Sequence, residues 1–316
     1  MRILANDGIS KTGKEMLEAA GYTVDTEHRP QDQLAQAIND GGYEILLVRS
    51  ATKVDNILMD ACPGLKMVGR GGVGLDNVDK YHAKNNGIIV FNTPEASSRS
   101  VAELVIGSMF TLSRSLHDSA RNLTQDDFGK LKKKYSNGIE LRGKSIGIIG
   151  FGRIGQELAS YAIAMGMDVF AVDLEDKEVI IPVEIYNKVI EVPVMVRKNF
   201  DVVRYCDFVS VHIPKQPNGD SAITYGDIEL MKDGVIIINT SRGGVVNEDD
   251  LLDALETGKV AAAALDVFED EPKPNPALLN HPKIFATPHI GAATVEAQYR
   301  IGTEIADIIT AVYGTK

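Results

Sequence analysis

The stretch SIGIIGFGRIGQELASYAIAMGMDVFAVD, residues 145–173, decides the fold. Its first residues form a short apolar run, which is typical of a buried parallel strand, and the apolar residues that follow recur at helical spacing. Between them lies GFGRIG, in which Gly150 allows a tight turn, Gly152 lets the backbone approach a pyrophosphate, and Gly155 permits close packing of helix on strand. The stretch therefore predicts a strand, a turn and a helix whose N-terminus binds a dinucleotide.

The second strand of this stretch ends in an acidic residue. Asp173 lies 173 − 155 = 18 residues beyond the last glycine of the motif. A carboxylate at this position accepts hydrogen bonds from the adenosine ribose and repels a 2′-phosphate. Because Leu174 rather than an arginine follows it, NAD is favoured over NADP. A glycine-rich turn without a nucleotide is the alternative, and the agreement of motif and context disfavours it.

Strand-like runs alternate with helix-length segments along the whole chain, which predicts parallel sheets with helical crossovers. The first series comprises RILAND, YTVDT, EILLVRS, LKMVGRGG and GIIVFNTP. The second series begins after residue 140 and comprises SIGIIG, DVFAVD, DFVSVHIP, VIIINTS, AAAALDV and IFATPHIG. Two α/β sheets in one chain are therefore expected.

The segments between and after the two series predict the domain boundaries. Residues 97–118 form a strongly apolar helix in which Ser100 and Glu103 have capping-box spacing, and Pro94 interrupts the chain just before it. Residues 293–314 form a long amphipathic helix that could return to pack on the first domain. We expect one discontinuous domain of residues 1–96 and 291–316, and a second of residues 97–290.

One segment does not fit the alternation. Residues 178–196, EVIIPVEIYNKVIEVPVMV, have two β-rich arms with a proline in each. Proline is excluded from the centre of a sheet, so an exposed hairpin is expected. It lies just after Asp173, near the expected adenine position, and is longer than we expect there.

Composition and charge exclude several classes of protein. The formal net charge of the 316 residues is −11, without a basic patch, so neither a nucleic acid nor a membrane surface is an expected partner. No signal peptide or membrane span is visible, and a cytoplasmic protein is expected. Cys62 and Cys206 suit a protein core rather than a disulfide framework, and the histidines and cysteines lack the spacing of metal ligands. No metal is expected.

The last three strands of the second series each end in polar residues suited to hydride transfer. Arg242 follows VIIINTS, His289 follows IFATP, and several carboxylates follow AAAALDV, namely Asp266, Glu269, Asp270 and Glu271. Histidine can exchange the hydroxyl proton in either direction, and a carboxylate beside it fixes the tautomer and favours the protonated ring. An arginine can hold a substrate carboxylate and polarise the neighbouring carbonyl. The residues alone do not choose among the three adjacent carboxylates of FEDEP.

Together these motifs resemble a known family. GFGRIG with Asp173, NTSRGG, ALDVFEDEP and TPHIGAAT, in this order and over nearly the whole chain, look like the NAD-dependent D-2-hydroxyacid dehydrogenases. The resemblance implies two doubly wound parallel-sheet domains, a Rossmann-type cofactor domain and a flavodoxin-like substrate domain built from both termini. It implies the catalytic residues Arg242, Glu271 and His289, and cofactor contacts from Gly150, Gly152, Arg153, Ile154, Gly155, Asp173, Ile213, Thr240, Ser241, Asp266, Gly291 and Ala292.

Within the family, VRSATKV, VGRGGVGLDNVD and FNTPEASSRSVAELVIG are most similar to the D-3-phosphoglycerate dehydrogenases of serine biosynthesis. This resemblance implies that Arg49, Ser50 and Arg70 bind the substrate's phosphate or its surroundings, and that the amides of Gly71, Gly72 and Val73 bind its carboxylate. Two arginines at strand ends could also pair with a dianion on physical grounds alone. Structural ion pairs of Arg49 and Arg70 are the alternative.

Three further expectations concern substrate, partners and regulation. A dehydrogenase for an unphosphorylated keto acid such as hydroxypyruvate or glyoxylate needs Arg49 and Arg70 less, and an NAD-sensing protein resembling the C-terminal-binding-protein corepressors would show no turnover. The family implies a homodimer formed through the region of residues 100–140. The chain ends 316 − 289 = 27 residues after His289, so feedback through a C-terminal regulatory domain is not expected.

Overall fold

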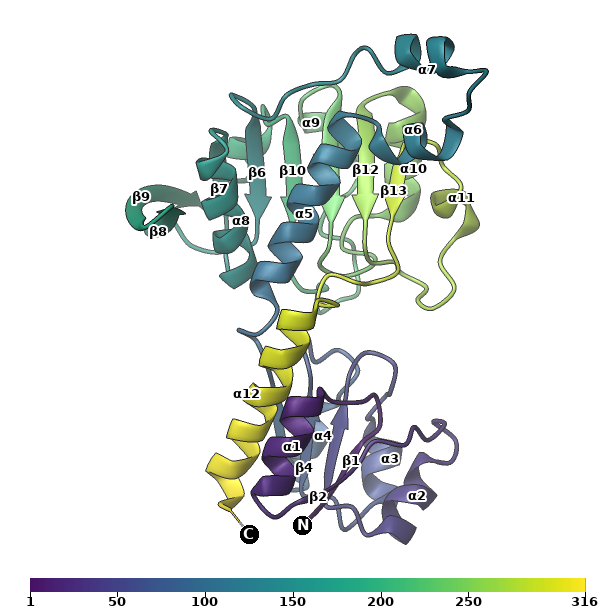
Figure 1. The fold of residues 1–316 in the computed structure, drawn as a ribbon, viewed down its shortest axis with the longest axis vertical. Helices are drawn as coiled ribbons and strands as arrows, with labels where there is room; N and C mark the ends of the chain where they lie inside the picture. Colours follow the sequence, from purple (N-terminus) through teal and green to yellow (C-terminus); the bar gives the residue numbers. More distant parts are fainter. Residues whose placement is uncertain (316) are drawn as a thin grey trace. The chain divides into compact units, whose positions relative to one another are not determined.

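The computed structural model describes residues 1–315, and the chain forms two compact units (Figure 1). The first unit is Met1–Ser100 together with the C-terminal segment from Ala292, and the second is Val101–Gly291. Each unit is a parallel-sheet α/β structure, as the alternation of apolar runs and helical segments predicts.

The first unit contains a five-stranded parallel sheet in the order β2-β1-β3-β4-β5, which is the flavodoxin-like order. All five expected strands are present, as β1 Arg2–Ala5, β2 Thr23–Asp25, β3 Ile45–Val48, β4 Met67–Arg70 and β5 Ile89–Asn92. The helices are α1 Lys11–Ala19, α2 Leu34–Gly41, α3 Asn56–Ala61, α4 Lys80–Asn85 and the long α12 Val295–Tyr313.

Helix α12 packs on one face of this sheet beside α1. Ile301, Ile305 and Ile309 of α12 belong to the same buried cluster as Ile3 of β1 and Ile45 of β3. The two helices cross closely, because a Cβ atom at Gly13 of α1 would lie 2.6 Å from the backbone oxygen of Gly302 in α12. The first unit is therefore completed by residues from the end of the chain.

The second unit contains an eight-stranded sheet in the order β13-β12-β11-β10-β6-β7-β9-β8. The six strands expected for the second series are β6 Ser145–Ile149, β7 Asp168–Val172, β10 Phe208–Val211, β11 Val235–Asn239, β12 Val260–Leu265 and β13 Ile284–Ala286. The two added strands are β8 Lys177–Ile185 and β9 Lys188–Arg197. The helical segments are α5 Ser98–Ser113, α6 Leu116–Asn122, α7 Phe128–Lys134, α8 Arg153–Ala164, η1 Phe200–Val203, α9 Tyr225–Leu230, α10 Glu248–Thr257 and α11 Pro276–Leu279.

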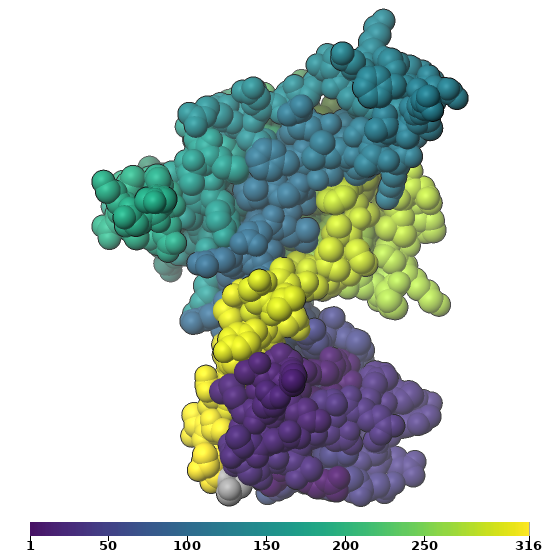
Figure 2. All heavy atoms as spheres, viewed as in Figure 1, coloured from purple at the N-terminus to yellow at the C-terminus, as the bar shows by residue number. Residues whose placement is uncertain are grey.

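Strands β8 and β9 form the expected hairpin, but the hairpin also extends the sheet. Strand β9 pairs in parallel with β7, and β8 pairs antiparallel with β9 at the sheet edge. One face of the hairpin is buried, through Ile181 and Val183 of β8 and Val194 and Val196 of β9. In the space-filling view its atoms form a lobe at the left of the second unit (Figure 2). The expected surface excursion is therefore partly a core element.

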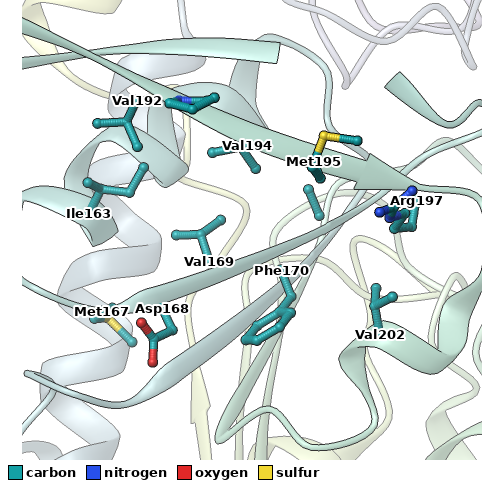
Figure 3. A pocket seen from close by; sticks show the side chains of 12 residues that line it. Ile163, Met167, Asp168, Val169, Phe170, Val192, Val194, Met195, Arg197 and Val202 are labelled. Carbon is teal, nitrogen blue, oxygen red and sulfur yellow. The ribbon is translucent and has the colours of Figure 1, made fainter. Parts of the chain in front are cut away.

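The pairing between β7 and β9 is short. It covers only Ala171 with Val196 and Val172 with Arg197. On the side of Ala171 the ladder ends before Phe170 and Met195, which the same register would place opposite one another. A cavity of about 550 Å³ lies where the strands separate, lined largely by apolar side chains (Figure 3).

The predicted capping box of the apolar helix is wrong. Helix α5 begins at Ser98, so Ser100 lies inside its first turn, and the Ser100 hydroxyl contacts the Thr294 hydroxyl at 2.8 Å. The Glu103 carboxylate accepts a hydrogen bond from the Tyr161 hydroxyl of α8 at 3.0 Å. The side chains of Ser100 and Glu103 therefore form hydrogen bonds with distant residues rather than with the first turn of the helix. The prediction of a buried helix is confirmed, since much of α5 lies in the core of the second unit.

Candidate active site

The glycine-rich turn joins β6 to α8. Gly150 has φ of +91°, and a Cβ atom there would lie 2.5 Å from the His212 backbone oxygen. A Cβ atom at Gly155 would lie 2.4 Å from the Gly150 oxygen, so the helix can approach the turn only without a side chain at this position. A Cβ atom at Gly152, the N-cap residue of α8, would meet nothing within 4 Å. The N-terminus of α8, where Arg153 and Ile154 begin the helix, is thus open to a phosphate group.

Asp173 lies directly after β7, as the sequence predicts. Its Oδ2 accepts a hydrogen bond from the Phe151 amide at 2.9 Å, and its Oδ1 accepts one from the Leu174 amide at 2.8 Å. The carboxylate therefore fixes the glycine-rich turn. Each carboxylate oxygen keeps a further lone pair with which it can accept a hydrogen bond from a ribose hydroxyl.

Two buried polar atoms near the ends of β10 and β11 have no hydrogen-bond partner within residues 1–315. They are Nδ1 of His212 and Oγ1 of Thr240. Burial lowers the pKa of His212 to about 4, so the ring is neutral, and its Nε2 lies 2.9 Å from the Ser210 hydroxyl. Buried polar atoms are normally paired, so these two fit a bound polar molecule beside the glycine-rich turn. The half-buried Ile213 follows His212 in the same loop.

The loop after β11 is organised by a residue that sequence reasoning missed. The Asn239 side-chain oxygen accepts hydrogen bonds from the Ser241 amide at 3.0 Å and hydroxyl at 2.8 Å, and its Nδ2 donates to the Arg242 carbonyl at 2.9 Å. The Ser241 hydroxyl, predicted to bind the cofactor, is thus engaged within the loop. A polar residue ending an otherwise apolar buried strand was the available signal. Gly243 is required here, because a Cβ atom would lie 1.8 Å from the Phe268 oxygen.

Asp266 follows β12 and holds the loop that carries His289. Its Oδ1 accepts hydrogen bonds from the Thr287 hydroxyl at 2.6 Å and the Ile290 amide at 2.8 Å, and its Oδ2 accepts one from the Gly291 amide at 2.8 Å. Asp266 is only 2% exposed. His289 itself has φ of +54°, an uncommon conformation for a residue with a side chain. The predicted cofactor residue therefore also shapes the loop of the predicted catalytic histidine.

The structure distinguishes the carboxylates that the sequence left open. Oε2 of Glu271 lies 2.8 Å from Nδ1 of His289, and its Oε1 accepts the Phe268 amide at 3.0 Å. Burial raises the pKa of Glu271, but the hydrogen bonds from His289 and Phe268 and the charge of Arg242 outweigh it and lower the pKa overall. The backbone amide of Glu269 donates to the Glu248 carboxylate at 2.6 Å, and the Glu269 carboxylate lies beside Gly244. Glu271 is therefore the carboxylate paired with His289.

Both His289 and Glu271 remain accessible to a ligand. Their side chains are 34% and 33% exposed. Because Nδ1 of His289 faces the carboxylate, the pair favours the tautomer with its proton on Nδ1, and Nε2 is left for proton exchange with a substrate.

The residues expected to bind the substrate's anionic groups lie in the first unit. Arg49 and Ser50 follow β3, and Arg70 ends β4. A cavity of about 270 Å³ at these strand ends is lined by Arg49 and Gly71. Two of the three expected carboxylate-binding amides are engaged within the protein, since the Gly71 amide donates to the Val48 carbonyl at 2.9 Å and the Gly72 amide to the Thr93 hydroxyl at 2.8 Å. Among the expected amides only that of Val73 has no acceptor within residues 1–315.

Ala292, expected to contact the cofactor, begins the C-terminal segment of the first unit. Its carbonyl accepts a hydrogen bond from Nε2 of Gln298 at 2.7 Å. Gln298 also accepts a hydrogen bond from the Arg49 guanidinium. Sequence reasoning did not single out Gln298, because a glutamine in an amphipathic helix carries no distinguishing pattern.

Residues 1–315 contain neither a candidate metal centre nor a candidate membrane-spanning helix. No group of three or more histidine, cysteine or acidic residues could hold a metal ion there. No helix among residues 1–315 has the length and apolar character needed to span a membrane.

A parallel sheet with a glycine-rich turn at a helix N-terminus, and an acidic residue at the end of the next strand, defines the second unit as a dinucleotide-binding unit. Residues 106–291 match the family model described as "D-isomer specific 2-hydroxyacid dehydrogenase, NAD binding domain". The chain belongs to this family, and its cofactor is NAD.

Known relatives carry different substrate names. The chain is 41% identical to a hydroxypyruvate reductase of Thermotoga maritima, over 98% of this chain and 97% of the relative. It is 38% identical to a D-3-phosphoglycerate dehydrogenase of Methanocaldococcus jannaschii, over 98% of this chain but only 57% of that protein. A D-lactate dehydrogenase of Aquifex aeolicus, solved with NAD and lactic acid, matches this chain with a TM-score of 0.76 at 26% identity. The match covers 100% of this chain and 96% of that chain. The family is therefore established, and the substrate is a separate question.

Proposed function

We propose that the chain transfers a hydride between NAD and the C2 atom of D-3-phosphoglycerate, interconverting it with 3-phosphohydroxypyruvate in serine biosynthesis. The observation that carries the chemistry is the Glu271–His289 pair, at 2.8 Å, with Arg242 close enough to lower the Glu271 pKa. The arginines of the first unit, Arg49 and Arg70, support a phosphorylated substrate over an unphosphorylated one.

His289 is proposed as the acid and base. Glu271 holds the proton on Nδ1, so Nε2 can accept the proton of the substrate's C2 hydroxyl during oxidation and return it to the keto oxygen during reduction. The charge of Glu271 then stabilises the imidazolium that forms. The Asp266 hydrogen bonds to the loop keep the ring in position for this exchange.

Arg242 is proposed to bind the substrate carboxylate. NH1 of Arg242 donates to the Ser241 carbonyl at 2.6 Å. The Asn239 side chain donates to the backbone carbonyl of Arg242, so the backbone that carries the guanidinium is fixed. A guanidinium beside a 2-keto acid also polarises the reacting carbonyl.

The residues of the second unit suit NAD. The open N-terminus of α8 would bind the pyrophosphate, and Asp173 would bind the adenosine ribose. The unpaired atoms of His212 and Thr240 would bind polar groups of the cofactor. When bound, NAD supplies the hydride acceptor of the oxidation.

The experiment is a comparison of NADH oxidation with 3-phosphohydroxypyruvate, hydroxypyruvate, pyruvate and glyoxylate. A kcat/KM at least tenfold higher for the phosphorylated acid would support the proposal. In the His289→Asn variant, kcat should fall about 10²- to 10⁴-fold while NADH affinity is retained. Unchanged turnover in that variant would exclude His289 as the acid and base.

Hydroxypyruvate reduction is the second candidate, and one observation favours it. The relative named hydroxypyruvate reductase matches over 97% of its own length. If hydroxypyruvate is preferred in the comparison, the roles of Arg242, Glu271 and His289 stand, and Arg49 and Arg70 serve a smaller anionic substrate or the structure.

We also propose a homodimer formed through the region of residues 100–140, which contains α6 and α7. Large apolar side chains are exposed on it, with Leu123 60% and Phe128 61% accessible. Aspartate at both positions should convert a dimer to a monomer in sedimentation equilibrium, because exposed apolar patches of this kind mark protein interfaces. A wild-type monomer, or an unchanged mass in the variant, would contradict this interface.

A further inference from the structure

Arg49 is half-buried, and no carboxylate of residues 1–315 forms an ion pair with its guanidinium. Burial lowers the pKa of Arg49, and the charge of the nearby Asp7 raises it by a smaller amount. The nearby Asp7 carboxylate is engaged elsewhere, since it accepts the Arg49 amide at 2.7 Å and the Thr52 amide and hydroxyl at 3.1 and 2.6 Å. The guanidinium, which like that of any arginine stays charged at neutral pH, therefore lines a cavity of about 270 Å³ at the ends of β1, β3 and β4.

Within residues 1–315, the one side chain that accepts a hydrogen bond from this guanidinium is neutral. Oε1 of Gln298 accepts from NH2 of Arg49, and Nε2 of Gln298 donates to the Ala292 carbonyl at 2.7 Å. The second hydrogen bond fixes which end of the amide faces Arg49. A glutamine in this position orients the guanidinium without cancelling its charge, whereas a carboxylate would form an ion pair with it.

We propose that Gln298 is a positioning residue of the substrate site: it holds the charged Arg49 guanidinium in the cavity so that an anionic group of the substrate can pair with it. The inference deepens the proposed function and rests on it, because the anion is taken to belong to a 2-keto or 2-hydroxy acid. The apolar side of the cavity, formed by Ile301 and Ile305 of α12, strengthens the interaction by excluding water.

Gln298 also fixes the backbone just beyond the catalytic loop. Ala292 directly follows Gly291, whose amide donates to Asp266, and Gly291 lies two residues after His289. A merely structural role at Ala292 would thus lower kcat and stability. A positioning role through Arg49 instead raises KM, because it weakens binding of the substrate's anion.

The test replaces the amide with a carboxylate. Gln298→Glu keeps the shape of the side chain and an acceptor for Arg49 but neutralises the guanidinium. We expect KM for the best 2-keto acid substrate to rise at least tenfold at saturating NADH, with kcat within about threefold of wild type. The control is Val295→Glu, which adds the same charge in the first turn of α12 at a side chain 83% exposed, and its KM should stay within about twofold. Equal KM values in the two variants would overturn the proposal.

A second arm asks whether Gln298 acts through Arg49. In an Arg49→Met background, Gln298→Glu should change KM by less than twofold, because the charge it neutralises is already absent. If the full effect of Gln298→Glu persists there, Gln298 acts by another route and the proposal fails.

A third arm is independent of turnover and uses inorganic phosphate. Phosphate should raise the melting temperature of the wild-type NADH complex in a concentration-dependent way, and Gln298→Glu should abolish that rise. If the wild type reduces none of the keto acids, the proposed function fails, and this arm alone decides on Gln298. No protection of the wild type, or equal protection of both proteins, would overturn the inference.

Discussion

A single methyl group at Gly243 should disable catalysis while leaving the cofactor unit folded. A Cβ atom there would lie 1.8 Å from the Phe268 oxygen and 2.4 Å from the Glu269 nitrogen. Ordinary contact begins near 3.4 Å, so the Phe268 carbonyl must retreat by about 3.4 − 1.8 = 1.6 Å. The same loop carries Glu271, which accepts the Phe268 amide and pairs with His289.

The size of the effect follows from that displacement. A misplacement of about 1 Å in a catalytic constellation costs on the order of 10²-fold in rate. Because the shift is larger than this, we expect kcat of Gly243→Ala to fall at least 10²-fold. NADH affinity, measured by fluorescence titration, should change by less than about threefold, since the glycine-rich turn and Asp173 lie on other loops.

The matched control is Gly107→Ala in the exposed part of α5, where a Cβ atom would meet nothing within 4 Å. This substitution should leave kcat unchanged and raise stability by up to about 1 kcal/mol. If Gly243→Ala turns over within a factor of three of wild type, the loop tolerates the methyl group and the link from Gly243 to Glu271 is wrong.

Three further predictions concern stability and cofactor choice. The folded pKa of His212 is about 4 and that of a free histidine is near 6.5, so between these pH values only the unfolded chain takes up this proton. The free energy of unfolding should therefore fall as the pH drops from about 6.5 towards 4, by at most about 3 kcal/mol. In urea unfolding at about pH 7 and pH 5, His212→Gln should lose correspondingly less of this free energy than the wild type, and an equal loss would contradict the assignment. Gly13→Ala should cost roughly 1–3 kcal/mol in the same assay, because its Cβ atom would lie 2.6 Å from the backbone of α12, and a neutral effect would mean that the two helices can separate freely. Asp173→Ser should narrow the preference for NADH over NADPH by at least tenfold in kcat/KM, and an unchanged preference would show that the carboxylate does not select the cofactor.

The strands, and the polar residues that follow them, could be predicted because both are read from local sequence. Apolar runs bounded by glycines, such as Val235–Ile238 before Arg242, can be buried in a parallel sheet and little else. The glycine-rich turn with Asp173 was visible for the same reason. Both arguments need only residues adjacent in the chain.

The features that the sequence did not predict depend on contacts between distant residues. The spacing of Ser100 and Glu103 matches a capping box, yet Thr294 and Tyr161 satisfy these side chains instead. The pairing of Glu271 with His289 could not be chosen over Glu269 from the residues alone, because it depends on how two loops meet. Gln298 is 298 − 49 = 249 residues from Arg49 in sequence, so no local pattern could join them.

The short ladder between β7 and β9 means that the hairpin is held mainly by its buried face rather than by backbone pairing. Only two residue pairs join β9 to β7, whereas Ile181, Val183, Val194 and Val196 lie in the core of the second unit. The tip of the hairpin is exposed, since the Tyr186 side chain is fully accessible. Insertions or substitutions at the tip therefore leave the buried face in place, together with the strand ends that carry Arg242, Glu271 and His289. Length and surface chemistry can vary at the tip without a change in the register of the sheet.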